Sequence, residues 1–243
     1  MSKKNRIRLF SYEILYENAS YVPSDAQIHY LKNVMRLTLD DEVFLFDGQN
    51  GEFRSVVADI SKKSLTLQVQ KKVYDFEKSP DVWLVFAPLK KENTDIVLQK
   101  AVELGVSKIM PVQTEYATKI QVKRERAELQ IIEAAEQSRR QDVPELLKTV
   151  SFDEMIKQWP ENRKLIYLNE TGKGMVFSAV ASELKEPVAL LVGPEGGFSK
   201  KELEILEKLP YTLSVTLGKR ILRAETAAIA ALSCWQAFCG DWR

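Results

Sequence analysis

Two glycine-containing stretches near the end of the chain carry residues whose types and spacing could form a ligand site. The first is Val188-Ala-Leu-Leu-Val-Gly-Pro-Glu-Gly-Gly-Phe-Ser, and the second is Leu213-Ser-Val-Thr-Leu-Gly-Lys-Arg-Ile-Leu-Arg. Each begins as an apolar strand, breaks at a glycine (Gly193 or Gly218) and resumes as a helix, which is how α/β proteins build crevices at the carboxyl ends of strands. We therefore expect the two loops to face one ligand.

The first loop has the composition of a preformed ligand cradle. Its glycines, Gly193, Gly196 and Gly197, permit positive φ and let backbone N–H groups approach a ligand. Ser199 and Glu202 have the spacing of a capping box, so a helix is expected to follow. The P-loop and Gly-x-Gly-x-x-Gly patterns are absent, which excludes the common nucleotide cradles. The alternative is a plain glycine-rich turn, but the basic residues in the second loop favour a ligand site.

Composition indicates an ordinary globular protein. The 243 residues are 45% hydrophobic, enough for one large or two small domains. The net charge is only +1, so any RNA affinity must come from local basic patches. No apolar run approaches the roughly 20 residues of a membrane span, and the start lacks a signal-peptide pattern, so a cytoplasmic protein is expected. Cys234, Cys239 and the single His29 cannot supply four zinc ligands, so we expect buried free thiols and no metal.

The first part of the chain has the pattern of a small β domain. Apolar and polar residues alternate from Asp41 to Lys72, and Asn50-Gly51 marks a hairpin between two such runs. An early strand is expected at residues 7–10 and a short helical segment at residues 29–37. In that segment the apolar side chains would pack inward and two basic ones would stay outside. These are Leu31, Val34 and Met35, and Lys32 and Arg36, respectively.

The pattern changes after a linker at residues 74–80, which contains Pro80 and charged residues. Strands then alternate with helices through residues 81–243. Strands are expected at 82–87, 108–112, 164–168 and in the two glycine stretches, and helices at 94–104, 122–139, 175–184 and 227–238. This alternation predicts a mostly parallel sheet covered on both faces.

The two glycine stretches resemble the C-terminal motifs of the SPOUT methyltransferases. Leu191-Val-Gly-Pro-Glu-Gly-Gly-Phe-Ser and Leu217-Gly-Lys-Arg-Ile-Leu-Arg-Ala-Glu-Thr-Ala are specifically similar to those of the bacterial 16S rRNA uridine-N3 methyltransferase family, RsmE. Residues 8–10, 29–36 and 46–48 resemble its PUA-like RNA-binding barrel, and residues 99–105 and 133–140 resemble the first half of its catalytic domain. The chain departs from the family at Glu115-Tyr-Ala117, where an Arg-Ser pair is expected after the glutamate.

The resemblance implies an architecture that composition cannot show. It implies a PUA-like β-barrel at residues 1–73, a linker at 74–80, and a SPOUT domain at 81–243 whose parallel sheet ends in a deep trefoil knot. General rules alone would reject a knot, since true knots are almost absent from folds. The partners implied are 16S rRNA, on the assembled small ribosomal subunit, and a second copy of the chain in a homodimer.

The resemblance also assigns a cofactor and its residues. S-adenosylmethionine is the implied methyl donor, bound at the two glycine loops. The residues implied to bind it are Leu191, Gly193, Gly197, Leu217, Gly218, Ile221 and Leu222. The implied reaction is methylation of N3 of a specific uridine in 16S rRNA.

Two residues are candidates for the chemistry. Arg223 is a permanent cation that can stabilise the uracil anion. Glu195 can accept a proton or orient groups around the cationic cofactor; the alternative is that Glu195 only ties its loop to backbone amides. RNA contacts through phosphates are expected from Arg8, His29, Lys32, Arg36 and Arg140. For His29 a purely structural role is equally expected.

Two other kinds of protein compete with this interpretation. A non-catalytic RNA-binding protein of the small subunit could keep the knot as a scaffold, but the intact glycine loops and Arg223 argue against it. A nicotinamide enzyme on a doubly wound sheet is disfavoured because the dinucleotide fingerprint is missing near the first strand.

Overall fold

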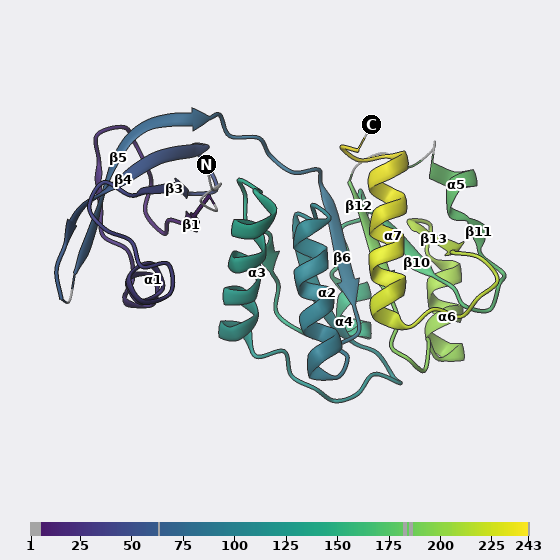
Figure 1. Cartoon of the computed structure of the whole chain (residues 1–243). Helices are drawn as coiled ribbons and strands as arrows, with labels where there is room; N and C mark the ends of the chain where they lie inside the picture. The colour runs from purple at the N-terminus through teal and green to yellow at the C-terminus, as the bar shows by residue number, and fades with distance from the viewer. Residues whose placement is uncertain (1–5, 63, 182–183, 185–186, 243) are drawn as a thin grey trace. The chain divides into compact units, whose positions relative to one another are not determined.

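The computed structural model describes residues 6–62, 64–181, 184 and 187–242. The chain divides into two compact units, one formed by Met1–Lys78 with Ala135–Val143 and the other by Ser79–Ala134 with Pro144–Arg243 (Figure 1). The first unit therefore recruits a short segment from the middle of the chain. Each unit has its own sheet and its own core.

The first unit contains a five-stranded mixed sheet in the order β1-β3-β4-β5-β2. Its strands are β1 (Arg8–Phe10), β2 (Ser20–Tyr21), β3 (Glu42–Phe46), β4 (Glu52–Ile60) and β5 (Leu65–Tyr74). β1 pairs with β3 in parallel, whereas β3, β4 and β5 form an antiparallel meander. Gly48 and Gly51 turn the β3–β4 hairpin with φ of 78° and 99°, which confirms the hairpin predicted from Asn50-Gly51.

The helical segment of this unit differs from its prediction. The structure has α1 (Asp25–His29), which begins at a Ser24–Gln27 capping box, followed by a π-helical turn, η1 (Tyr30–Val34). The prediction that Val34 packs inward is wrong, because its side chain is 59% exposed, while Leu31 is fully buried. A π-helical turn holds one residue more than an α-helical turn, so it rotates the positions that follow away from the expected face.

The second unit is built on a parallel sheet in the order β11-β13-β10-β12-β6-β7-β8, with β9 paired to β7. The strands are β6 (Val82–Phe86), β7 (Lys108–Gln113), β8 (Glu145–Leu146), β9 (Val150–Ser151), β10 (Lys164–Leu168), β11 (Met175–Val176), β12 (Val188–Val192) and β13 (Thr212–Thr216). All five residues of β12 are buried. That burial is expected of a central strand with both faces covered, and it confirms the mostly parallel sheet.

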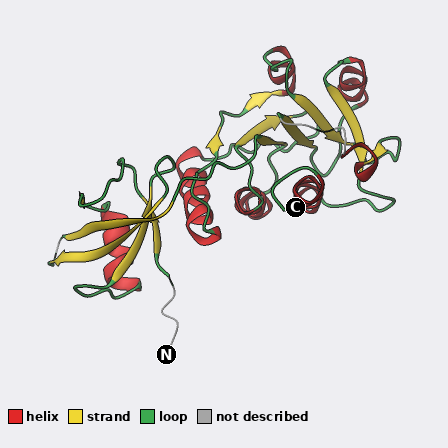
Figure 2. Ribbon diagram, turned by 90° about the horizontal axis from the view of Figure 1, so that it is seen from above, coloured by secondary structure: helices red, strands yellow, loops and turns green. Residues whose placement is uncertain are grey.

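Helices lie on both faces of this sheet (Figure 2). The helices of this part of the chain are α2 (Lys91–Glu103), α3 (Arg124–Ser138), whose last residues belong to the first unit, α4 (Phe152–Lys157), α5 (Phe177–Val180), α6 (Lys200–Lys208) and α7 (Ala224–Phe238). α7 packs against α2 and β12, and α6 packs against β13. The single helix predicted for residues 175–184 is instead β11 followed by the short α5, and part of that range lies outside the described residues.

Arg163 fastens the starts of three neighbouring strands in this unit. Its Nη1 donates to the carbonyl oxygens of Asp81 (3.2 Å) and Val188 (3.0 Å), and its Nη2 donates to the Asp81 carboxylate at 2.7 Å. Burial alone would raise the pKa of Asp81, but hydrogen bonds and charge from Arg163, with hydrogen bonds from Ser107 and Trp83, outweigh it and lower that pKa. The ionised form of Asp81 is therefore favoured by the fold.

The two cysteines lie in the last turns of α7 and directly after it. Cys234 and Cys239 are free thiols and are partly buried, not fully buried as predicted. Cys239 Sγ lies 3.2 Å from the carbonyl oxygen of Ala181, and burial raises the pKa of Cys234.

Among the described helices, none combines the length and apolarity needed to cross a membrane.

Candidate active site

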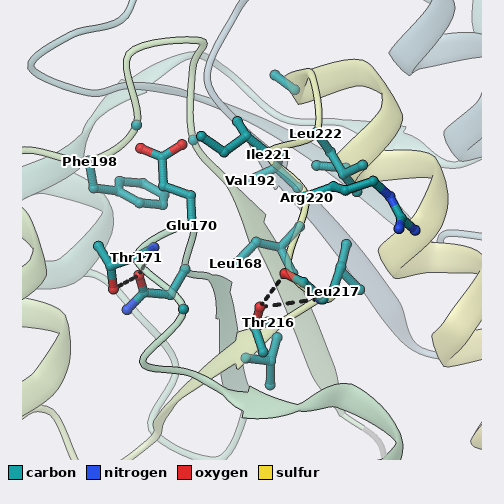
Figure 3. A pocket seen from close by; sticks show the side chains of 18 of the residues that line it. Leu168, Glu170, Thr171, Val192, Phe198, Thr216, Leu217, Arg220, Ile221 and Leu222 are labelled. Carbon is teal, nitrogen blue, oxygen red and sulfur yellow. Dashed lines mark hydrogen bonds between the residues drawn. The ribbon is translucent and has the colours of Figure 1, made fainter.

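Three loops of the second unit border one cavity of about 360 Å³ (Figure 3). They are residues 169–172 after β10, 193–198 after β12 and 217–222 after β13. Because these strands are adjacent and parallel, their carboxyl ends meet at one edge of the sheet, where α/β proteins bind ligands. The two glycine loops singled out in the sequence therefore lie on the same cavity.

The loop after β12 is shaped by Gly197 and by the start of α6. Among its three glycines Gly197 alone has a positive φ, 68°, and its N–H donates to the carbonyl oxygen of Pro194 at 2.9 Å. The predicted capping box is present: Glu202 N donates to Ser199 Oγ (3.2 Å), and Ser199 N donates to Glu202 Oε2 (2.8 Å). The loop thus enters α6 in a fixed conformation.

A neighbouring loop supports the same region. The N–H of Glu115 donates to Glu202 Oε1 at 2.9 Å. A Cβ placed on Gly196 would lie 3.2 Å from Cβ of Tyr116. The segment in which the sequence departs from the family pattern therefore packs on the outer side of the glycine loop.

The loop after β13 is held by hydrogen bonds to the hydroxyl group of Thr216, the last residue of that strand. Gly218 has a φ of 110°, and its N–H donates to Thr216 Oγ1 at 3.3 Å. Thr216 Oγ1 in turn donates to the Gly218 carbonyl oxygen at 3.2 Å. The loop ends at Arg223, the N-cap residue of α7. Ile221, two residues earlier, is 81% exposed.

The third loop was missed in the sequence. It begins at Asn169, whose N–H donates to the Val215 carbonyl oxygen (2.8 Å) and whose Nδ2 donates to Ser214 Oγ (3.1 Å). Asn169 Oδ1 accepts hydrogen bonds from the backbone N–H (3.0 Å) and Oγ1 (2.7 Å) of Thr171. The polar run Asn-Glu-Thr-Gly directly after an apolar strand was the signal for this turn.

Glu170 lies in the turn made by Asn169 and Thr171, next to Gly197 of the loop after β12. A Cβ on residue 197 would collide with Oε1 of Glu170 and lie 3.0 Å from its carboxyl carbon. Within the part of the chain that the structure describes, the Glu170 carboxylate has no hydrogen-bond or ion-pair partner. The positive φ at position 197 thus favours glycine, and a larger residue there would also displace the Glu170 carboxylate.

Most of the residues implied to bind a cofactor line this cavity. Those that do are Gly193, Gly197, Leu217, Gly218, Ile221 and Leu222. Leu191 is fully buried within β12 and is not part of the lining. The lining residues that the sequence did not suggest include Asn169, Glu170, Thr171, Phe198 and Thr216.

The two candidates for chemistry differ in their surroundings. Glu195 lines the cavity and is exposed, and its carboxylate accepts no hydrogen bond from any described residue. No hydrogen bond among the described residues therefore supports the alternative in which Glu195 only ties its loop to backbone amides. Arg223 is exposed, and it lies between Leu222 and Ala224, which line the cavity, without lining it itself.

The residues expected to contact RNA fall into two groups. His29 and Arg36 are exposed, and Lys32 Nζ donates to the carbonyl oxygens of Ser61 and Lys62, the latter at 2.8 Å. Arg8 and Arg140 are buried, at 6% and 9% exposure. Their surroundings give them structural partners instead of open surface.

Arg8 holds the end of α3 to β1 inside the first unit. Its Nη1 donates to the carbonyl oxygens of Ala135 (3.0 Å) and Glu136 (2.8 Å), and its Nη2 donates to that of Arg140 (2.9 Å). Its Nε donates to Glu52 at 2.6 Å. Burial lowers the pKa of Arg8, while Glu52 partly offsets that effect. An arginine at the carboxyl end of a helix satisfies carbonyl groups that have no partner within the helix.

Comparison with known proteins identifies the class. Residues 77–236 match the model of an RNA methyltransferase domain, and residues 23–70 match that of an RNA methyltransferase PUA domain. A structure titled as a ribosomal RNA small subunit methyltransferase E from Neisseria gonorrhoeae bound to S-adenosyl methionine aligns with a TM-score of 0.88 and 28% identity, covering 98% of this chain and all of that one. The fold and the cavity thus define an RNA methyltransferase of the SPOUT class, which confirms the predicted SPOUT-type, mostly parallel sheet preceded by a PUA-like domain.

Individual relatives identify the family. Ribosomal RNA small subunit methyltransferase E from Rickettsia conorii is 35% identical, covering 95% of this chain and 94% of that protein. The protein of the same name from Buchnera aphidicola subsp. Schizaphis graminum is 33% identical, with 98% and 99% covered. A Legionella pneumophila protein solved with the cofactor SAM is 31% identical, with a TM-score of 0.87 and 98% and 99% covered. The chain belongs to the ribosomal RNA small subunit methyltransferase E family.

Proposed function

We propose that the chain transfers a methyl group from S-adenosylmethionine to N3 of one uridine in 16S rRNA, with the assembled small subunit as substrate. The observation that carries this proposal is the cavity where the three loops meet at the carboxyl ends of β10, β12 and β13. The names of the relatives support rRNA as the substrate, and the Neisseria structure bound to S-adenosyl methionine supports the donor.

The residues around the cavity fit this donor. Its volume of about 360 Å³ falls in the range of roughly 300–1,000 Å³ typical of small-molecule sites. Glycine at position 197 leaves room for the Glu170 carboxylate at the cavity. Among the residues that the structure describes, none pairs with the carboxylates of Glu170 and Glu195, which suits a cation. We assign contacts with the adenine and methionine parts to Gly193, Gly197, Leu217, Gly218, Ile221 and Leu222, with Leu191 supporting them from β12.

Methyl transfer requires an unpaired and correctly placed base. The bound donor supplies a methyl group on a sulfonium centre. Uracil N3 forms the new C–N bond while the C–S bond breaks. The electron pair of the C–S bond stays on sulfur. The Watson–Crick edge of the uracil carries N3, so the base must be unpaired or flipped before it can react. Holding N3 in line with the methyl group removes much of the barrier by position alone.

Glu195 and Arg223 have the properties needed for the remaining tasks. The N3 proton must leave, and the exposed carboxylate of Glu195 at the cavity is our candidate acceptor. Negative charge then develops on the uracil, and the Arg223 guanidinium is our candidate to stabilise it. The backbone of Arg223 is fixed at the start of α7, because its carbonyl oxygen accepts a hydrogen bond from Ala227 N–H at 2.8 Å.

We propose that the PUA-like part, residues 1–73, positions the rRNA, and that residues 74–80 link it to the catalytic part, residues 81–243. The exposed His29 and Arg36, with Lys32 beside them, are the proposed phosphate contacts of the first unit. Arg8 and Arg140 are buried. We propose that these two act on RNA binding through the fold of the first unit.

We further propose that the enzyme works as a homodimer in the cytoplasm. Apolar side chains near both ends of α7, Ile221 at 81% and Phe238 at 45% exposure, are suited to being covered by a second copy. Light scattering across a concentration series is the measurement that checks this. A monomer at every concentration would contradict the dimer and leave the chemistry standing.

The decisive experiment compares methylated uridines in 16S rRNA, mapped by mass spectrometry, with and without the gene. One N3-methyluridine should disappear when the gene is deleted and return when it is restored. An unchanged map would favour the alternative, an RNA-binding protein without catalysis. Thermal shift with S-adenosylmethionine separates the two further, because a ligand that binds the native state raises the unfolding midpoint.

A further inference from the structure

Glu170 is a carboxylate that the proposed chemistry leaves without a task. It lines the cavity, and within the described residues it has neither a hydrogen-bond donor nor a cation as partner. Glu195, which also lines the cavity, is our candidate proton acceptor, and Glu202 is held in the capping box at the start of α6. An unpaired carboxylate in a cavity is a binding group for a ligand cation.

The position of Glu170 is fixed by the turn that carries it. Asn169, the residue before Glu170, donates hydrogen bonds to β13. Its side chain also accepts a hydrogen bond from Thr171, the residue after Glu170. The Glu170 carboxylate lies against Gly197, in the space that a Cβ at position 197 would occupy. The backbone that carries the exposed Glu170 side chain is therefore held in place before a ligand arrives, which reduces the entropy lost on binding.

The surroundings of Glu170 fit a cation that has no N–H donors. Figure 3 shows its carboxylate directed toward the part of the cavity where the Phe198 ring and the Ile221 side chain lie. An ammonium group needs acceptors for three N–H bonds, whereas the Glu170 carboxylate, with the Phe198 ring and the Ile221 side chain beside it, offers the oxygens of a single group (Figure 3). A sulfonium carries a positive charge without hydrogen-bond donors, and aromatic faces and a single carboxylate suit such a cation.

We propose that Glu170 is a specificity-determining residue that distinguishes the cationic methyl donor from the neutral thioether product by placing its carboxylate against the sulfonium centre. This inference rests on the proposed use of S-adenosylmethionine. Transfer of the methyl group removes the positive charge from sulfur, so the attraction to Glu170 disappears with the reaction. The spent cofactor is then released more readily than the donor.

The loss of charge on sulfur also predicts how Glu170 affects KM for the donor and kcat. The sulfonium charge is full in the bound donor and reduced in the transition state, so Glu170 stabilises the ground state at least as much as the transition state. Glu170→Gln should therefore raise KM for the donor and leave kcat close to the wild-type value. It should also make the product a stronger inhibitor relative to the donor.

Calorimetric titration of the full chain with S-adenosylmethionine and with S-adenosylhomocysteine tests the proposal. We expect Glu170→Gln to weaken binding of the donor about tenfold and to leave binding of the product within about twofold. Glu207→Gln, which removes an exposed carboxylate of α6 outside the cavity, is the matched control and should change neither affinity. The thermal midpoint of each variant reports whether it is folded.

Three outcomes would overturn the proposal, and they differ in what else they remove. Equal weakening of both ligands would assign Glu170 to the α-amino group, which donor and product share. Unchanged binding of both would leave Glu170 without a role in recognition. In either case the methyltransferase proposal survives, because wild type still binds the donor. If wild type binds neither ligand, the use of this cofactor fails, and the role of Glu170 fails with it.

Discussion

Gly197 is the residue on which the shape of the cavity depends most directly. Its φ of 68° lies in the region that disfavours side chains, and the space where a Cβ would stand is taken by Glu170. The two constraints act together, since one fixes the backbone and the other fixes the wall of the cavity. Gly193 and Gly196 lack the positive φ and are restricted only by neighbouring aromatic side chains.

Gly197→Ala should lower donor affinity at least tenfold, because Glu170 must move, and should destabilise the protein by about 1 kcal/mol through backbone strain. Calorimetry and thermal unfolding measure the two effects. Gly172→Ala is the matched control: its φ of 75° gives similar strain, but a Cβ there meets no atom within 4 Å. Equal loss of affinity in both variants would contradict the role of the collision.

Arg223→Ala should reduce methylation at least a hundredfold while donor binding, measured by calorimetry, stays close to wild type. The reason is that the guanidinium is proposed to act on the developing uracil anion, and Arg223 does not line the cavity itself. Arg223→Lys, which keeps the charge but not the planar fork, should retain an intermediate rate. Full activity in Arg223→Ala would remove this assignment.

At the scale of elements, parallel strands bring the three loops together. β10 lies between β12 and β13, so the loops that follow these strands meet at one edge, although other elements separate them in the chain. Arg163 and Asp81 tie the opposite ends of β6, β10 and β12. This tie lies at the strand starts, away from the loops, so its contribution is to the stability of the sheet.

Stability should depend on pH through Asp81. Its pKa is lower in the folded state than its ordinary value, so its contribution is complete above about pH 4 and is lost as pH falls through the folded pKa. At neutral pH Asp81→Asn should cost about 1 kcal/mol, because Arg163 loses its charged acceptor while solvent screens the Asp81 carboxylate, which is 40% exposed. Urea unfolding at several pH values should show this difference shrinking below about pH 4. A constant difference would contradict the linkage.

At the scale of the whole molecule, the near-zero net charge of +1 leaves RNA binding to local patches. The first unit places the exposed His29 at the end of α1 and the exposed Arg36 just after η1, while its buried arginines serve its own structure. A positive φ of 55° at Arg36 marks the end of the π-helical turn. Phosphate contacts made there would be screened by salt, as other exposed charges are.

RNA affinity should therefore fall as salt rises, and Arg36→Ala should reduce the slope of log K against log salt by about 0.7 to 0.9, the contribution of one phosphate contact. Binding of a 16S rRNA fragment, followed by fluorescence anisotropy at several salt concentrations, measures the slope. Lys208→Ala removes an exposed charge from α6 in the other unit and should leave the slope unchanged. A wild-type slope near zero would argue against phosphate contacts altogether.

Local sequence determined those features that depend on neighbours along the chain. Alternating apolar residues predicted the β meander, the Asn50-Gly51 pair predicted its hairpin, and Ser199 with Glu202 predicted the start of α6. The glycines predicted the two cavity loops, because backbone freedom belongs to the residue itself. The resemblance to a known family supplied the knot and the order of the domains, which no local pattern specifies.

Tertiary structure decided which side chains face the cavity and which are buried. Glu170 lies far from Gly197 in the chain and meets it only because β10 and β12 are neighbours in the sheet. Arg8 reads as a surface cation in the sequence, but the end of α3 buries it among carbonyl groups. Exposure and partners arise from contacts between distant segments, and charge and spacing along the chain do not encode which segments meet.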